Sequence, residues 1–254
     1  MTESVETMLN SEAAQALISE GRRLQRGPRQ FVPFTGVDAV DRQCNNLERH
    51  PHLFVLGCVC DLQVKTETAW QIPVRLADLA GSARFSALEA LPDRRIRHLL
   101  KGPPALHRFP EQVARRIRGA LTNLRDSYGG NAARIWTGTP PSAEVVYRFL
   151  QFDGVGQKIA NMAAGILARQ FKIPMSDYSS IDISVDRHVR RVFERLHLVE
   201  PGAPSEHLIF RARAIYPRFP GLLDRPAFEL GRTWCKERAP LCSTCPLSAV
   251  CPTA

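Results

Sequence analysis

The 254-residue sequence contains no long hydrophobic run. No stretch of roughly 18 or more apolar residues occurs, so an ordinary transmembrane helix is not expected. Residues 1–10 have neither the basic nor the apolar region of a signal peptide, and the sequence shows no internal repeat or low-complexity tract. We therefore expect a monomeric protein of the cytoplasm that makes no contact with a membrane.

Cysteine is scarce in most of the chain and concentrated at one end. Cys44, Cys58 and Cys60 are scattered through the first quarter, whereas the other four cysteines lie in residues 235–251. A secreted disulfide framework would be spread more evenly and would suit a smaller chain. The first three are best interpreted as buried free thiols, and the C-terminal group as a metal site.

Negative charge is also in short supply. The net charge is +9, and arginine is far commoner than lysine. Arginine suits phosphate because its planar guanidinium can donate two parallel hydrogen bonds. A basic excess favours a polyanionic partner, although many basic proteins bind no nucleic acid, so charge alone leaves DNA or RNA binding undecided.

Apolar residues recur with helical spacing along most of the chain. The pattern is clearest before Gly129-Gly130, which should end the helix. Its apolar stripe consists of Val113, Ile117, Leu121, Leu124 and Tyr128. The expected helices cover residues 11–25, 52–60, 67–79, 86–91, 93–101, 111–128 and 157–171, with further helices that open at Ser142, as N-cap, and at Asp186.

The segment Gly154-Val155-Gly156 joins two of these helices, over about residues 142–171. Glycines allow a sharp turn and a close approach of another backbone. The first N–H groups of the second helix have no partner within it and can bind a phosphate without reading base sequence. For Gly-x-Gly alone, an ordinary corner between two helices is the simpler interpretation.

Two motifs together change this balance. The stretches Gly154–Ala160 and Val185–Val192 resemble the signature of the endonuclease III family. The resemblance implies an all-α, two-lobed helix-hairpin-helix DNA glycosylase that flips a damaged base out of the duplex. It also implies that Lys158 attacks the sugar and that Asp186 assists. The DNA contacts that we expect from it are Gly154, Val155, Gly156, Arg187 and His188.

An amine can perform chemistry that water cannot. It can attack C1′, expel the base and leave a Schiff base, after which the strand can break by elimination. Asp186 could stabilise the positive charge that develops on the sugar. Taken singly, Lys158 could equally be a phosphate-binding or solvated lysine, and Asp186 a helix N-cap. In relatives that only remove the base, another residue replaces the lysine, so Lys158 indicates combined glycosylase and lyase activity.

The C-terminal cysteines have the spacing C-x6-C-x2-C-x5-C, formed by Cys235, Cys242, Cys245 and Cys251. Four thiolates can hold either zinc or an iron–sulfur cluster. The same spacing in the endonuclease III family implies a [4Fe-4S] cluster with a structural role. The cluster loop would then hold Lys236 and Arg238 near DNA phosphates.

Three features depart from the family pattern. Residues 159–185 form a longer connection between Lys158 and Asp186 than is typical, and the extra segment near 173–184 contains Asp182, a rival for the acidic role. The Gln-Ala-Thr-Asp segment of the family is absent, and Gln63 either replaces it or is a polar turn residue. Phe152-Asp153 stands where the family has leucine and proline. These departures put the usual oxidised-pyrimidine substrate in doubt.

The sequence thus predicts a helical barrel domain over residues 50–178 and a cluster domain from residues 1–49 and 179–254. The predicted function is base-excision repair by a glycosylase with AP lyase activity. Its partner would be double-stranded DNA with a damaged base or an abasic site, in the nucleoid if the protein is bacterial. The alternatives are a glycosylase without lyase activity and a non-catalytic iron–sulfur protein that binds DNA.

Overall fold

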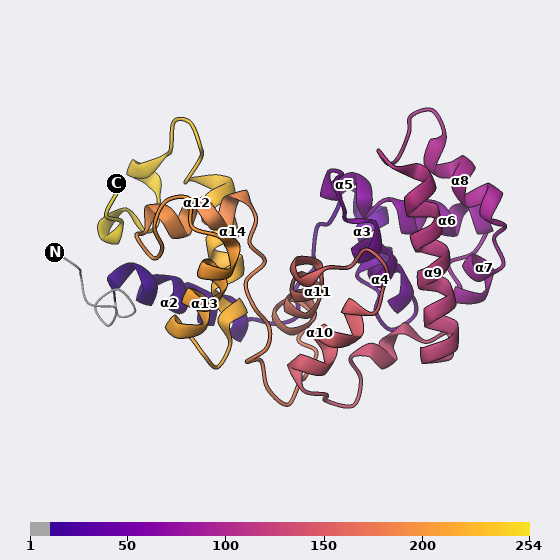
Figure 1. Ribbon diagram of the computed structural model, residues 1–254, viewed down its shortest axis with the longest axis horizontal. Coiled ribbons are helices and arrows are strands. Elements are labelled where there is room, and N and C mark those ends of the chain that lie inside the picture. Colours follow the sequence, from indigo (N-terminus) through magenta and orange to yellow (C-terminus); the bar gives the residue numbers. More distant parts are fainter. Residues whose placement is uncertain (1–10) are drawn as a thin grey trace. The chain divides into compact units, whose positions relative to one another are not determined.

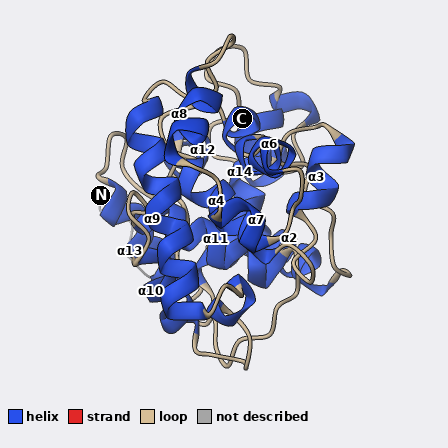
Figure 2. Cartoon of the chain, turned by 90° about the vertical axis from the view of Figure 1, so that its right-hand side faces the viewer, coloured by secondary structure: helices blue, strands red, loops and turns tan. Residues whose placement is uncertain are grey.

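The computed structural model describes residues 11–254. Within this range the chain is helical and contains no strand, which confirms the predicted all-α class (Figure 2). No helix in the same range is both long and apolar enough to cross a membrane. The expectation for residues 1–10 lies outside the described residues.

The chain divides into two compact units. The first, which we call the mixed unit, consists of residues 11–29, 141–146 and 164–254. The second, the barrel unit, consists of residues 30–140 and 147–163. These bounds differ from those of the expected domains, because residues 30–49 fall in the barrel unit and residues 141–146 and 164–178 in the mixed unit.

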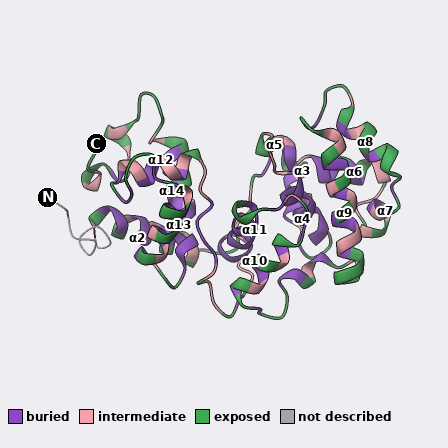
Figure 3. Cartoon of the chain, viewed as in Figure 1, coloured by how far each residue is buried: buried purple, intermediate pink, exposed green. Residues whose placement is uncertain are grey.

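The barrel unit is built around α4 (Pro51–Cys60), all of whose residues are buried (Figure 3). Trp70 packs on this helix at Gly57, where an added Cβ would lie 2.5 Å from the indole ring. Phe34 stacks on Trp70 with ring centroids 3.7 Å apart. The other helices of this unit are α3 (Asp38–Cys44), α5 (Thr66–Ala69), α6 (Ile72–Ala80), α7 (Phe85–Glu89), α8 (Asp93–Lys101), α9 (Pro110–Tyr128) and η1 (Ala132–Ile135) (Figure 1).

Two sequence predictions for this unit are confirmed and one is wrong. The apolar stripe of α9 is buried, and the helix ends at Gly129 in the left-handed conformation (φ +60°). The helix at 93–101 is α8. The single helix expected over 67–79 is instead α5 and α6. Pro73 explains the break, because proline has no N–H and its ring would clash with the carbonyl four residues earlier.

The mixed unit packs α12 (Arg187–Arg195) against α14 (Asp224–Thr233). Val189, Val192 and Phe193 on α12 are buried, as predicted. The remaining elements that lie wholly in this unit are α2 (Glu12–Arg26), α13 (Ser205–Ile215), η2 (Pro220–Leu223), η3 (Cys242–Thr244) and η4 (Ser248–Val250). The helices α10 (Ser142–Leu150) and α11 (Gln157–Arg169) each contribute residues to both units.

The predicted N-cap at Ser142 is wrong. Ser142 is the first residue of α10, and its hydroxyl serves the irregular segment that follows α11. It donates to the Asp177 carboxylate at 2.7 Å and accepts from the Ser180 N–H at 3.1 Å. The serine therefore ties the extra segment to the start of α10 instead of capping the helix.

Candidate active site

The hairpin between α10 and α11 is shaped by glycine. Gly154 has a φ of +84°, which side-chain-bearing residues rarely adopt, and an added Cβ would meet the Arg116 guanidinium. Gly156 has open space around it, and its carbonyl accepts the Ala160 N–H at 3.0 Å in the first turn of α11. Val155 is buried between the two glycines. The turn is thus anchored by its central residue, while Gly156 stays exposed at the start of α11.

Lys158 is an exposed residue in the first turn of α11. Its ammonium group interacts electrostatically with Asp61, which follows the last residue of α4. The Asp61 carboxylate accepts from Trp70 Nε1 and Thr66 Oγ1, each at 3.4 Å. Burial raises the pKa of Asp61, although these two donors and Lys158 pull it downward. The barrel unit therefore places a partly buried carboxyl group near the predicted nucleophile.

Sequence reasoning missed Asp61. From the sequence, Gln63 is assigned as a possible replacement for the Gln-Ala-Thr-Asp segment, and Asp61 is given no role. The available signal was an acidic residue immediately after a largely apolar stretch, where it is held close to the core. No pattern in the sequence, however, relates that position to Lys158, nearly a hundred residues later.

Gln63 is exposed and adopts a left-handed conformation (φ +55°). The preceding residue, Leu62, is held by His107, whose Nε2 lies 2.9 Å from the Leu62 carbonyl oxygen. The Phe109 N–H donates to Nδ1 of the same ring, so Nε2 carries the proton of the neutral imidazole. Burial lowers the pKa of His107 and favours this neutral form. The turn at Gln63 is therefore held in place by His107. This is compatible both with a residue that fills the gap left by a flipped base and with an ordinary polar turn residue.

Asp186 lies in the mixed unit and is the N-cap of α12. Its Oδ1 accepts from the N–H groups of His188 and Val189, both at 2.8 Å. The neighbouring Arg187 is exposed, and His188 packs edge-on against Phe228 with ring centroids 5.6 Å apart. Asp186 thus caps α12, and a chemical role for its carboxylate stays a prediction.

Asp182, the rival acid, is committed to an ion pair. Its side chain is only 3% exposed, and its two oxygens accept from Arg213 Nε at 2.7 Å and Nη2 at 2.8 Å. A bidentate pair of this kind fixes the carboxylate in one position. Asp182 therefore stabilises the extra segment.

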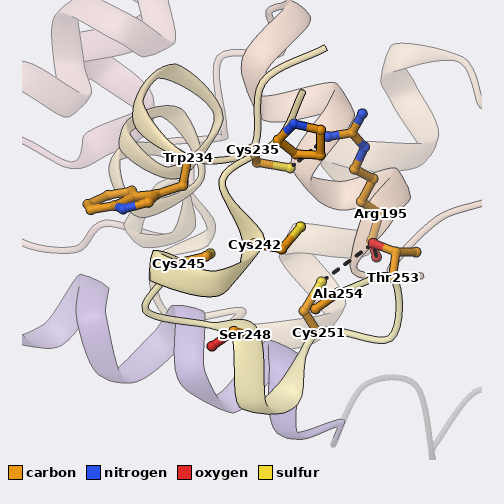
Figure 4. Close-up of a pocket in the computed structure, with 10 residues that line it drawn as sticks. Arg195, Trp234, Cys235, Cys242, Cys245, Ser248, Cys251, Thr253 and Ala254 are labelled. Carbon is orange, nitrogen blue, oxygen red and sulfur yellow. Dashed lines mark hydrogen bonds between the residues drawn. The ribbon is translucent and has the colours of Figure 1, made fainter. Parts of the chain in front are cut away.

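The four C-terminal cysteines line one pocket of about 300 Å³ (Figure 4). Arginines of α12 hold the surrounding loop: Arg191 Nε donates to the Cys235 carbonyl at 2.6 Å, and Arg195 Nη1 lies 3.4 Å from Cys235 Sγ. Trp234 also lines the pocket. Cys44, Cys58 and Cys60 are buried free thiols, as predicted.

The donor set of this pocket fits a polynuclear cluster. Four thiol groups surround one cavity, and four cysteines are the usual ligands of a [4Fe-4S] cluster. Within residues 11–254 no group of three or more His, Cys, Asp or Glu side chains is arranged to hold a metal ion. The four cysteines therefore line a common pocket, but their side chains do not form a closed metal site.

Several solved structures have a fold similar to that of this chain. The chain superimposes over 94% of its length on 94% of a trapped endonuclease III–DNA covalent intermediate, with a TM-score of 0.61 and 20% identity. A thermostable thymine-DNA glycosylase covers 95% of the chain with a TM-score of 0.62 and 15% identity. The fold is that of the endonuclease III-like DNA glycosylases.

Parts of two known proteins, an endonuclease III and an adenine DNA glycosylase, are also similar to the chain in sequence. The chain is 31% identical over 140 residues to endonuclease III of Thermotoga maritima, which covers 55% of the chain and 56% of that protein. It is 29% identical over 142 residues to mouse adenine DNA glycosylase, 24% of whose length is covered. No protein-family profile matches the chain. The chain spans about half the length of the endonuclease III that it matches.

The endonuclease III-like fold thus confirms the architecture predicted from the hairpin motif. The structure brings Gly154, Val155, Gly156 and Lys158 together at one turn, and it brings Asp186, Arg187 and His188 together at the start of α12. These two groups belong to different units.

Proposed function

We propose that this chain is a base-excision repair DNA glycosylase with AP lyase activity, whose nucleophile is Lys158. The observation that carries the proposal is the position of Lys158 in the first turn after the glycine hairpin, with the Asp61 carboxyl group nearby. The fold of endonuclease III and the sequence similarity to endonuclease III of Thermotoga maritima support it. The partner is double-stranded DNA with a damaged base or an abasic site, bound by a monomer in the cytoplasm, or in the nucleoid if the protein is bacterial.

The reaction begins with loss of a proton from the Lys158 ammonium group, because only the neutral amine carries a lone pair. The amine lone pair forms a bond to C1′ of the flipped nucleotide, while the glycosidic bond breaks and its electrons leave with the base. The departing base takes up a proton. Opening of the sugar then gives the imine between Lys158 Nζ and C1′, which acidifies the neighbouring carbon and permits elimination of the phosphate.

Carboxyl groups have two separate tasks in this scheme. Asp61 attracts the Lys158 ammonium group and accepts the proton that the amine must lose. Its burial makes it a better base than an exposed carboxylate, since burial raises its pKa. Asp186 stabilises the positive charge that develops on the sugar. Gln63 helps to fill the gap that the flipped base leaves, and Arg187 and His188 also contact DNA.

Cys235, Cys242, Cys245 and Cys251 hold a [4Fe-4S] cluster in this proposal, with zinc as the rival metal. When bound, the cluster supplies structural cohesion to the loop, and Lys236 and Arg238 then face DNA phosphates. The donor set and the shared pocket support this assignment. Iron and sulfide analysis of purified protein, together with its visible absorption, separates the cluster from zinc.

The decisive experiment is borohydride trapping on duplex DNA with an abasic site. Wild-type protein should give a covalent adduct, and Lys158→Ala should give none. Lys101→Ala is the matched control, because Lys101 is a surface lysine of the barrel unit that forms an exposed ion pair with Glu111. An adduct that persists in folded Lys158→Ala would refute this nucleophile.

The similarity to adenine DNA glycosylases favours one second candidate, a glycosylase without lyase activity. In that case folded, cluster-loaded wild-type protein would release a base and leave the strand intact, with no trapped adduct. Absence of both base release and adduct would favour a non-catalytic DNA-binding protein.

A further inference from the structure

Arg116, near the middle of α9, is a buried arginine without adequate partners. Its side chain is 11% exposed, and both Nε and Nη1 are wholly buried without a hydrogen-bond acceptor in the described part of the chain. Arg118, two residues later, has the hydrogen-bond acceptors that a partly buried arginine usually has. It donates to the Asp93 carboxylate at 2.7 Å and to backbone carbonyls. The Arg116 charge has therefore been removed from water with little compensation, which is costly.

The guanidinium of Arg116 lies against the hairpin turn. A Cβ at Gly154 would come within 2.5 Å of Arg116 Nε and 2.7 Å of Cζ, so the glycine leaves room for this group. The ion-pair partner of Arg116 is Asp153, at the long distance of 3.9 Å, and the Asp153 side chain is 76% exposed. A solvated carboxylate at this distance neutralises a buried cation poorly.

The other titratable neighbour offers no negative charge. His107 lies close enough for the Arg116 charge to contribute to its lowered pKa, after the larger effect of burial. The hydrogen bonds of His107 are satisfied by Leu62 and Phe109, so it accepts nothing from Arg116. Arg116 thus lies between a neutral imidazole and a glycine turn.

We propose that a phosphodiester of the DNA backbone is the missing counter-charge of Arg116, bound at the hairpin turn that this residue supports. The inference rests on the proposed function. A buried guanidinium is screened weakly by salt, so its attraction for a phosphate at Gly154–Gly156 is stronger than that of a surface arginine. Removal of this charge should lower DNA affinity without lowering the stability of the free protein.

The test compares Arg116→Met with Arg115→Met, whose side chain is the exposed neighbour on α9 and carries the same charge. The measured quantities are the Kd for a duplex with a non-cleavable abasic analogue at several salt concentrations, and the Tm without DNA. We expect Arg116→Met to weaken binding about tenfold and to reduce the slope of log Kd against log salt by about one. Its Tm should be unchanged or higher, because an unpaired buried charge is removed. Arg116→Lys should keep the wild-type slope.

Three results would overturn the inference while leaving the proposed function intact. The first is an unchanged slope in Arg116→Met, and the second is an equal slope loss in Arg115→Met. The third is a lower Tm with unchanged affinity, which would make Arg116 a structural support of the hairpin. Wild-type protein that binds no duplex DNA would instead refute the proposed function, and this inference with it.

Discussion

The interior of the barrel unit and that of the mixed unit are stabilised by different interactions. The barrel unit has an interior of aromatic and aliphatic side chains: Phe54 contacts the rings of Trp70, Trp136 and Phe149 within 6.3 Å, centroid to centroid. The mixed unit also has an apolar core, but it contains a buried arginine–carboxylate pair as well. Arg169 pairs with Asp224 at 3.0 Å and donates to the Gly221 carbonyl, and both charged side chains are buried.

The two units are therefore expected to differ in how far their stability depends on a bound group. Hydrophobic burial stabilises a helix bundle without any specific partner. The loop around the four cysteines is also held by arginine–carbonyl bonds, and in the proposed function it would gain stability from the cluster that the cysteines bind. The following predictions, from the largest expected effect to the smallest, test this contrast.

Loss of a cysteine ligand should have the largest effect, and it should fall on the mixed unit. Cys242→Ser should abolish metal binding and destabilise the loop 235–254 by several kcal/mol, because metal-binding energy is folding energy for such loops. Limited proteolysis should then cut within the loop. Cys60→Ala, which removes a buried thiol of the barrel unit, should keep its full metal content. Equal protease resistance in Cys242→Ser and wild type would contradict this prediction.

The buried pair Arg169–Asp224 should be the next most sensitive feature. Arg169→Met leaves Asp224 buried and unpaired, which should cost about 3–5 kcal/mol of unfolding free energy in urea titration. Burial raises the pKa of Asp224, and Arg169 opposes that effect. The double variant Arg169→Met/Asp224→Leu should recover part of the loss. A double variant as unstable as Arg169→Met alone would show that the charge pair is not the reason.

Acid should weaken the barrel unit through His52. Its ring is buried, with Nε2 2.9 Å from the Ala83 carbonyl oxygen, and burial lowers its pKa from 6.5 to about 4. The unfolded chain therefore binds more protons between these values, so stability should fall as the pH drops from 6.5 to about 4, by about 3 kcal/mol in total. His52→Gln should show a smaller decrease over this window in urea unfolding. Parallel pH profiles would contradict the assignment.

Two glycines of the barrel unit should respond in opposite directions. Gly57→Ala places a methyl group 2.5 Å from the Trp70 ring and should cost about 1–3 kcal/mol by overpacking. Gly119→Ala, on α9 with nothing within 4 Å of the added Cβ, should stabilise the protein by roughly 0.5–1 kcal/mol. Thermal unfolding of the two variants measures both effects, and equal Tm shifts would show that the interior is less tightly packed than described.

Elements with strong local patterns could be predicted from the sequence. The stripe of α9 and its glycine stop are local, so periodicity and turn chemistry were sufficient. The break at Pro73 was a local signal that the apolar periodicity of 67–79 concealed. The hairpin and the cysteine spacing could be recognised in the sequence because each occupies a short stretch of chain.

Long-range features of the candidate site could not be predicted. Asp61 and Lys158 interact across the fold of the barrel unit, and Arg116 meets Gly154 from a different helix. In the sequence, Arg116 is one of several arginines on α9, and its unusual burial has no local signature. Ser142 likewise looked like a cap because its partner Asp177 follows only after the next helix.

The cap at Asp186 makes folding and chemistry separable by a single substitution. The backbone N–H groups of His188 and Val189, in the first turn of α12, both donate to one oxygen, Asp186 Oδ1. Asparagine retains an oxygen there and caps helices as well as aspartate does, but it carries no charge. If Asp186 has the catalytic role proposed above, Asp186→Asn should give an inactive but fully folded protein that could be captured with an intact damaged nucleotide. Alanine at this position would not separate a lost reaction from a frayed helix.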